Sequence, residues 1–234
     1  AVLTNAAASA TGIGMIRFHS SSGLAHLVLH STPSVVVQPG KVTAWLIGSG
    51  IEAKKYSDIT TWLRHRWFKL ATLQSVPTVL DAGALRMAGS LEQPTVITPH
   101  SGELSKLLIS RGISVSAEAI EGNPKKWVQE AADTLGVTVL LKGSTTYVAN
   151  DAVLIQLPTA TPWLATAGSG DVLAGIIGSL VATNTVEILN DYNHLAAVVA
   201  SAAFIHARAA DAASNGGPIN AEAIINSIPS VISR

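Results

Sequence analysis

Residues 165–175 have the sequence ATAGSGDVLAG, which joins a glycine turn directly to an apolar helical pattern. A turn of this kind opens a helix, whose unpaired N–H groups and positive dipole end suit an anion such as a transferring phosphoryl group. Asp171 falls in the first helical turn, where it is placed to accept a proton from a substrate hydroxyl. Ordinary capping of the helix is the alternative for the same acid.

The composition is that of an apolar and electrically neutral domain. Of the 234 residues, 48% are hydrophobic and only 13% are charged, with 15 basic and 15 acidic side chains. This balance lacks the basic face that a nucleic-acid partner requires. No apolar run approaches the roughly 18–20 residues that span a bilayer, and no signal peptide is visible. The absence of cysteine fits a cytoplasmic protein, and we expect one domain over residues 1–234.

Predicted strands and helices alternate along most of the chain. Apolar runs predict strands or extended pieces at residues 15–18, 35–37, 42–47, 77–81, 95–98, 137–142, 145–149 and 153–157. Helical spacing predicts helices at residues 1–10, 23–30, 58–72, 101–108, 123–135, after the glycine turn, and at 191–213 and 220–228. Such alternation indicates an α/β fold, in which helices cover both faces of a mostly parallel sheet.

Several polar or small residues follow predicted strands, where ligands bind in open parallel sheets. Gly48 and Gly50 are typical of a ligand-binding turn, although glycine also permits a close turn without a ligand. Asp81 is placed either for ligand contact or as a helix N-cap. His100 and Glu103 are placed either for a ligand or for a capping box at the start of the helix.

Lys142 ends an apolar predicted strand, a position that usually excludes lysine. Its ammonium group either extends to solvent or meets a phosphate. Residues 143–146, with the sequence GSTT, offer amides and hydroxyls beside it. The glycine spacing gives neither a dinucleotide-binding fingerprint nor a Walker A loop, and there is no nucleophile elbow. The seven histidines are scattered, so we expect no dedicated metal cage.

Three segments taken together resemble the ADP/ATP-dependent NAD(P)H-hydrate dehydratases of the ribokinase-like superfamily. They are ITPHSGE at 97–103, LKGSTT at 141–146 and ATAGSGDVLAG at 165–175. The segments IGSG at 47–50, LDAGAL at 80–85 and FIHARAAD at 204–211 are also similar to the family. The resemblance covers essentially the whole chain and implies a ribokinase-like three-layer sandwich, with a mostly parallel central sheet and helices on both faces.

The resemblance implies an enzyme that repairs hydrated nicotinamide cofactors. ADP, or less favourably ATP, would phosphorylate the ring hydroxyl of (S)-NADH-hydrate or (S)-NADPH-hydrate, and elimination of phosphate would restore NADH or NADPH. Mg²⁺ would accompany the nucleotide, held largely by phosphates and water. A homo-oligomer and a functional link to an NAD(P)H-hydrate epimerase are implied as well.

The matching motifs also imply residue roles. Asp171 would be the catalytic base, and the anion hole would consist of Gly168, Ser169 and Gly170. The nucleotide would contact Lys142, Gly143, Ser144, Thr145, Thr146 and Gly170. The hydrated cofactor would contact Ala1, Gly50, His100 and Asp171. Asp81 and Glu103 are further candidates, and no residue is assigned as a metal ligand.

The chain departs from the family pattern at several positions. Ala167 replaces a usual glycine, Trp163 stands where glycine is common, and Gly83 stands where an acid is common. The family's first strand and glycine turn would precede Ala1, which opens a helix without a cap, so we expect residues upstream of it in the natural protein. The alternative functions are a kinase for a small alcohol or vitamin precursor, and a non-catalytic nucleotide-binding module.

Overall fold

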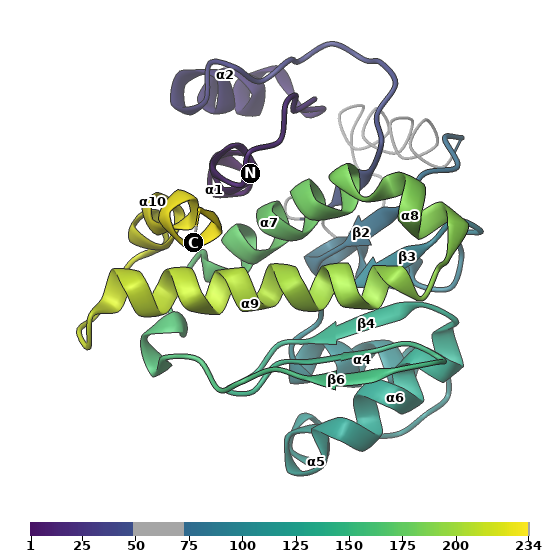
Figure 1. Ribbon diagram of the computed structural model, residues 1–234. Helices are drawn as coiled ribbons and strands as arrows, with labels where there is room; N and C mark the ends of the chain where they lie inside the picture. Colours follow the sequence, from purple (N-terminus) through teal and green to yellow (C-terminus); the bar gives the residue numbers. More distant parts are fainter. Residues whose placement is uncertain (49–72, 234) are drawn as a thin grey trace.

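A six-stranded sheet forms the centre of the computed structural model, which describes residues 1–48 and 73–233 (Figure 1). The strands lie side by side in chain order: β1 (Trp45–Ile47), β2 (Thr78–Leu80), β3 (Thr95–Ile97), β4 (Thr138–Leu141), β5 (Tyr147–Ala149) and β6 (Leu154–Gln156). β1 to β4 are parallel, whereas β5 and β6 are antiparallel to their neighbours. The prediction of a mostly parallel sheet is therefore confirmed.

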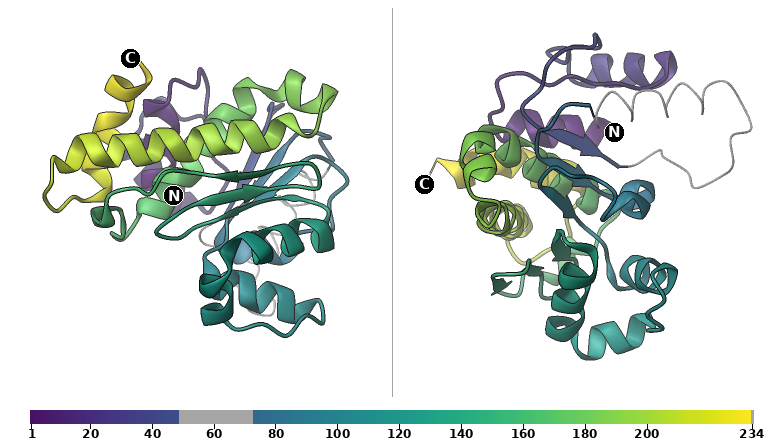
Figure 2. Two further views of the ribbon diagram at one scale, coloured as in Figure 1. Left: turned by 60° about the horizontal axis from the view of Figure 1, so that its bottom comes forward. Right: turned by 90° about the vertical axis from the view of Figure 1, so that its right-hand side faces the viewer.

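Alternate residues of the strands face opposite helical layers, as the period of two in a strand requires. Val79, Val96 and Leu140 pack into one apolar cluster, whereas Leu80 and Ile97 pack into the other. The first cluster is completed by α1 (Val2–Ala10), α7 (Ser169–Thr183), α9 (His194–Ser214) and α10 (Ala221–Ile232). The second is completed by η1 (Ala82–Met87), α4 (Ser101–Ser110), α5 (Ala117–Gly122) and α6 (Pro124–Leu135). Figure 2 shows the resulting three layers.

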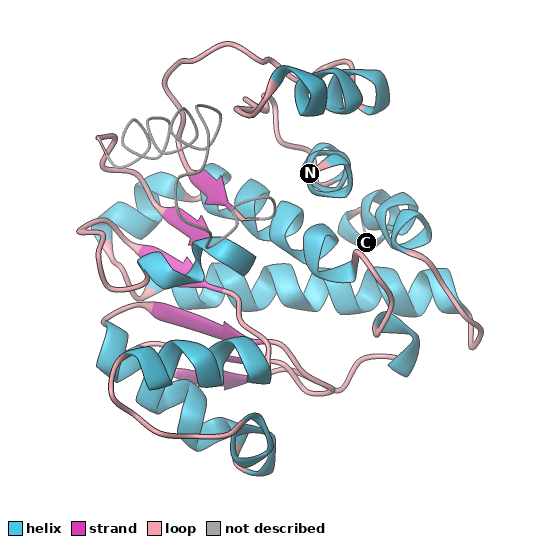
Figure 3. Cartoon of the chain, turned by 180° about the vertical axis from the view of Figure 1, so that it is seen from behind, coloured by secondary structure: helices cyan, strands magenta, loops and turns pink. Residues whose placement is uncertain are grey.

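The remaining elements lie at the margins of these layers. They are α2 (Ser22–Ser31), which contacts α1, α8 (Thr185–Asn190), which follows α7, and the short η2 (Pro162–Leu164). In the described part of the chain, α9 is the one helix long and apolar enough to cross a membrane by length and composition, and 56% of that window is buried inside the protein. It crosses the face of the sheet beside α7 (Figure 3), so its apolar surface belongs to the core.

One predicted strand is wrong, and two short α-helices and the 3-10 helices η1 and η2 were not predicted. Residues 15–18 form only a single parallel bridge, between Arg17 and Val36. None of the four residues is buried, Met15 being 59% exposed, and the pairing stops after one bridge, so no regular ladder forms. α5 and α8 have six residues each and show too few turns for a helical period to stand out. The predicted helix at 58–72 lies outside the described residues.

Candidate active site

The glycine turn at the start of α7 is in contact with several other helices. Gly168 is the N-cap residue and has φ 85°, a left-handed conformation that favours glycine. A Cβ at Gly168 would collide with the side chain of Leu3 in α1 and lie 3.2 Å from the Cβ of Ala221 in α10. The left-handed backbone conformation therefore favours glycine at this position, and a side chain would also displace Leu3.

Ser169, the next residue, forms a buried polar contact with α9. Its hydroxyl lies 3.3 Å from Nε2 of His206, and the two residues are only 7% and 5% exposed. Burial lowers the pKa of His206 to about 4, although a backbone hydrogen bond with Ser169 acts in the opposite direction. The imidazole is therefore neutral at physiological pH. The N–H of Ser169 donates to the Thr166 carbonyl at 3.2 Å.

The low pKa of His206 predicts a loss of stability in acid. Its folded-state value of about 4 lies below the ordinary 6.5, so the unfolded chain binds more protons between these pH values. The free energy of unfolding should therefore fall as the pH falls, by about 2 kcal/mol between pH 7 and pH 5. Urea titrations at both pH values measure this loss. His206→Gln, which cannot titrate, should lose about 2 kcal/mol less over the same interval, and an equal loss would contradict the prediction.

Gly170 lies beside Lys142, which follows β4. A Cβ on Gly170 would be 3.9 Å from the Lys142 ammonium nitrogen. That nitrogen lies 3.0 Å from Oδ1 of Asp81 and 3.8 Å from Oε2 of Glu103. The Thr98 hydroxyl also donates to Asp81 Oδ1, at 2.7 Å. Two carboxylates therefore balance a lysine that lies at the positive end of α7.

Asp171 is held from α1. The Thr4 hydroxyl donates to its Oδ1 at 3.0 Å, and the Ala1 nitrogen lies 3.8 Å from the same oxygen. The side chain of Asp171 remains 30% exposed. Gly168, Ser169 and Asp171 are thus each in contact with residues from elsewhere in the chain, and Asp171 presents a carboxylate that solvent can reach.

His100 and Glu103 form the capping box that the sequence offered as one alternative. His100 Nδ1 accepts from the N–H groups of Gly102 and Glu103 at 3.1 and 3.4 Å. Glu103 Oε2 in turn accepts from the N–H of His100 at 3.0 Å. The His100 side chain is nevertheless 59% exposed, so capping does not prevent contact with a ligand.

Asp81 is the N-cap residue of η1, as one alternative predicted, but its side chain makes no capping hydrogen bond. Its carboxylate is already committed to Lys142 and Thr98. Residues 143–146 follow Lys142 in the turn between β4 and β5. There the Thr145 hydroxyl pairs with that of Thr159 at 3.1 Å. Gly50 lies outside the described residues.

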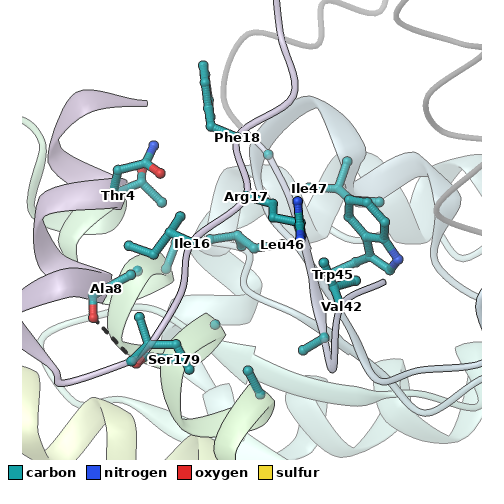
Figure 4. A pocket seen from close by; sticks show the side chains of 18 of the residues that line it. Thr4, Ala8, Ile16, Arg17, Phe18, Val42, Trp45, Leu46, Ile47 and Ser179 are labelled. Carbon is teal, nitrogen blue, oxygen red and sulfur yellow. Dashed lines mark hydrogen bonds between the residues drawn. The ribbon is translucent and has the colours of Figure 1, made fainter. Parts of the chain in front are cut away.

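Asp81 and Asp171 line the same cavity, which has a volume of about 470 Å³. Its walls come from α1, residues 13–20, residues 41–48 and α7. Figure 4 labels Ile16, Arg17, Trp45 and Leu46 among the residues that line it. Within residues 1–48 and 73–233, no group of three or more His, Asp or Glu side chains is arranged to hold a metal ion.

Thr4, Thr98 and His206 contact the predicted site residues but were not themselves predicted. Thr98 lies inside the segment ITPHSGE, and His206 lies inside FIHARAAD. Both segments resemble the family, so the resemblance could have identified these two residues. Thr4 is separated from Asp171 by 167 residues and belongs to an alanine-rich helix, which gives no signal. Only the packing of α1 on α7 reveals its contact.

The departures from the family pattern fall on different parts of the structure. Trp163 lies in η2 and is 44% exposed, with its Nε1 donating to the Gly216 carbonyl at 3.3 Å. Ala167 is exposed immediately before the glycine turn, and Gly83 lies in η1. The turn itself keeps a regular helix start, with the Val172 N–H donating to the Gly168 carbonyl at 3.1 Å.

This sheet topology, with a glycine turn and an acid at a helix start, defines a ribokinase-like α/β domain. A ribokinase-like superfamily protein from Enterococcus faecalis superposes with a TM-score of 0.78 at 21% identity, covering 99% of this chain and 81% of its own. A family model described as NAD(P)H-hydrate dehydratase matches residues 1–230. The chain belongs to the NAD(P)H-hydrate dehydratase family.

Two further relatives show how far the similarity extends. The bifunctional NAD(P)H-hydrate repair enzyme Nnr of Mycobacterium tuberculosis is 37% identical over 198 residues, which is 78% of this chain and 38% of that protein. The chain thus spans about two fifths of such a relative. The ADP/ATP-dependent NAD(P)H-hydrate dehydratase from Bacillus subtilis, co-crystallised with ATP and Mg²⁺, superposes with a TM-score of 0.81 at 23% identity, covering 100% of this chain and 86% of its own.

Proposed function

We propose that the protein dehydrates (S)-NADH-hydrate and (S)-NADPH-hydrate back to NADH and NADPH, with ADP or ATP as phosphoryl donor. The observation that carries this proposal is the solvent-accessible carboxylate of Asp171 at the start of α7, in a chain that matches the dehydratase family over residues 1–230. A helix start that presents amides and a carboxylate together suits the transfer of a phosphoryl group to a hydroxyl.

The first step is phosphorylation of the hydrated ring. Asp171 accepts the proton of the ring hydroxyl, and the oxygen of that hydroxyl attacks the terminal phosphorus of the nucleotide. The bond from that phosphorus to the bridging oxygen breaks, which releases AMP from ADP or ADP from ATP. The amides of Gly168 and Gly170 and the Lys142 ammonium stabilise the negative charge on the phosphoryl oxygens, whereas the N–H of Ser169 already donates to the Thr166 carbonyl. The 3.9 Å separation of Lys142 from a Cβ position on Gly170 supports this shared role.

The second step is elimination. The C–O bond to the new phosphate breaks, the neighbouring ring carbon loses a proton, and the ring double bond is restored. Phosphate leaves far more readily than hydroxide would, which is the reason for the phosphorylation. His100 and Ala1, together with Gly50, would contact the hydrated nicotinamide, and the 59% exposure of His100 is compatible with this assignment.

The nucleotide would lie against Lys142 and residues 143–146. Mg²⁺ fits this arrangement as an ion carried by the nucleotide, because it retains several waters and needs few protein ligands. When bound, it would neutralise part of the phosphate charge. In the described ranges, no cluster of three or more potential ligands exists to hold the ion by protein groups alone. Whether ADP or ATP is preferred is decided by the assay described below.

We also propose that a strand preceding Ala1 fills the apolar part of the cavity. In β1, the backbones of Trp45 and Ile47 form the hydrogen bonds with the neighbouring chain of β2. The N–H and carbonyl of Leu46 therefore point to the opposite edge of β1, away from β2. The backbones of Ile16 and Phe18 form hydrogen bonds with that of Val36. The N–H and carbonyl of Arg17, which lies between them, therefore point away from Val36. Leu46 and Arg17 both line the cavity, and a strand between them would satisfy both edges. The intact mass of the natural protein, or its gene, tests this proposal.

A second activity is expected to accompany the dehydratase. The relatives are described as bifunctional repair enzymes, which supports a functional link to an NAD(P)H-hydrate epimerase. A homo-oligomer and a cytoplasmic location stay predictions, supported by the family resemblance. Analytical ultracentrifugation of the purified protein tests the oligomeric state.

Recovery of absorbance at 340 nm tests the proposed function. The protein is incubated with hydrated NADH and Mg²⁺, with ADP in one sample and ATP in another. We expect NADH to reappear, together with one phosphate and one AMP or ADP for each NADH. A phosphorylated small alcohol with no recovery of NADH would favour a kinase of the same fold. Nucleotide binding without turnover would favour a non-catalytic module.

Thr4→Val should weaken catalysis without unfolding the protein. The substitution keeps the shape of the side chain but removes the hydroxyl that donates to Asp171 at 3.0 Å. A hydrogen bond to a charged group contributes roughly 1.5 kcal/mol, so kcat/KM should fall about tenfold. Steady-state assays with hydrated NADH measure the effect. Thr4→Ser retains the donor and should remain within about twofold of the wild type; an equal loss in both variants would contradict a role for the hydroxyl.

A further inference from the structure

His206 is a buried titratable residue with no part in the proposed chemistry. It projects from the long core helix α9 and is 5% exposed. A buried polar side chain requires a partner, and its ring nitrogen Nε2 lies 3.3 Å from the Ser169 hydroxyl. Because burial keeps the ring neutral, it has one N–H and one lone pair, so it can exchange a hydrogen bond with a hydroxyl.

Ser169 is the residue through which the glycine turn can be anchored. Gly168 and Gly170 on either side of it have no side chain, and glycine has more backbone freedom than any other residue. Other residues can only pack against these glycines, as the Leu3 side chain does against Gly168. A hydrogen bond through the Ser169 hydroxyl has direction, so it restrains Ser169 more specifically than packing restrains the two glycines.

We propose that His206 is a positioning residue, which acts through the Ser169 hydroxyl to orient the amides of Gly168 and Gly170 for the transferring phosphoryl group. The structural part of this inference rests on the 3.3 Å contact and the burial of both residues. Its catalytic part rests on the proposed function. Since oriented amides stabilise a transition state only when they are fixed beforehand, a loosened turn should slow the chemical step more than it weakens nucleotide binding.

Hydrogen exchange of the ligand-free protein tests the structural part. The amide of Val172 reports on the turn, because it donates to the Gly168 carbonyl at 3.1 Å. In His206→Leu and in Ser169→Ala, we expect this amide to exchange about tenfold faster, whereas Ile176 and Ile177 later in α7 should be unchanged. His206→Gln places a neutral amide near the position of Nε2 and should restore most of the protection. Unchanged exchange at Val172 in folded Ser169→Ala would overturn the proposal, whether or not His206→Leu folds.

Turnover of hydrated NADH tests the catalytic part. We expect kcat to fall by about 10- to 100-fold in Ser169→Ala and His206→Leu, with the nucleotide KM within about threefold of the wild type. The double variant should be no slower than His206→Leu alone, because loss of the imidazole already removes every hydrogen bond between the two residues, including the one to the Ser169 backbone. Wild-type kcat in all variants would overturn the catalytic part. If the wild type itself restores no NADH, the proposed function fails, and the exchange at Val172 still decides whether His206 orders the turn.

Discussion

Asp171→Asn should lower the turnover of hydrated NADH by about 1,000-fold, the loss typical of removing a general base. Asparagine has nearly the same shape, but its amide cannot accept the proton of the ring hydroxyl at neutral pH. Thr4 would lose a charged acceptor at 3.0 Å, yet the start of α7 would keep its amides. Nucleotide binding should therefore persist. Single-turnover assays at 340 nm measure the first effect, and calorimetric titration with ADP or ATP measures the second.

A matched control comes from an acid on the other face of the sheet. Asp133 in α6 accepts a hydrogen bond from Gln129 at 2.9 Å and does not line the cavity. Asp133→Asn makes the same chemical change away from the proposed site, so turnover should stay within about twofold of the wild type. Near-normal turnover in Asp171→Asn would remove Asp171 from the role of base.

Gly175→Ala should destabilise the whole domain. A Cβ at this position would overlap the Thr4 carbonyl oxygen and lie 2.9 Å from the Ala7 Cβ. Backbone atoms cannot rotate away, so α1 would have to move off α7. Forced overpacking of this kind costs about 2 kcal/mol, which corresponds to a fall in Tm of roughly 4–8 °C for a domain of this size. Thermal unfolding followed by circular dichroism measures the change.

Gly178→Ala, one turn further along α7, is the control. Its added Cβ would meet the Leu46 side chain at 3.3 Å, and that side chain borders the cavity and has room to adjust. The higher helix propensity of alanine offsets the small cost of this contact. We expect the Tm to change by less than about 3 °C. Equal losses in the two variants would contradict the prediction that the close contact between α1 and α7 at Gly175 is what makes alanine costly there.

The layered architecture could be predicted because its signals are local. Runs such as Val137–Lys142 contain nearly continuous apolar residues, as expected for a strand buried on both faces. Asn123 followed by Pro124 predicts the start of α6, and the structure confirms it with the Asn123 side chain accepting from the Lys126 N–H at 3.4 Å. The antiparallel pairing of β5 with β4 follows from their short connection.

The connections within the site could not be predicted, because they join residues that are distant in sequence. Lys142 alone is compatible with a phosphate ligand, but its partners Asp81 and Glu103 come from two other segments. Residues 15–18 show the converse failure. Their pattern is that of a strand, yet a strand also requires partners on its edges, and the apolar pattern does not specify them. Asp171 was correctly placed at a helix start, whereas its contact with Thr4 depends on helix packing.

The contacts around residues 168–171 have a consequence for the order of folding. Thr4 and Asp171 are separated by 167 residues, and Ser169 and His206 by 37. A longer loop costs more conformational entropy to close, so contacts between residues far apart in sequence form more slowly than local helices. We therefore expect the turn to be assembled in stages, with the packing of α9 on α7 preceding that of α1 on α7. Until α1 packs against Gly175, the carboxylate of Asp171 lacks its hydrogen-bond donor, so helical structure precedes a competent site during refolding.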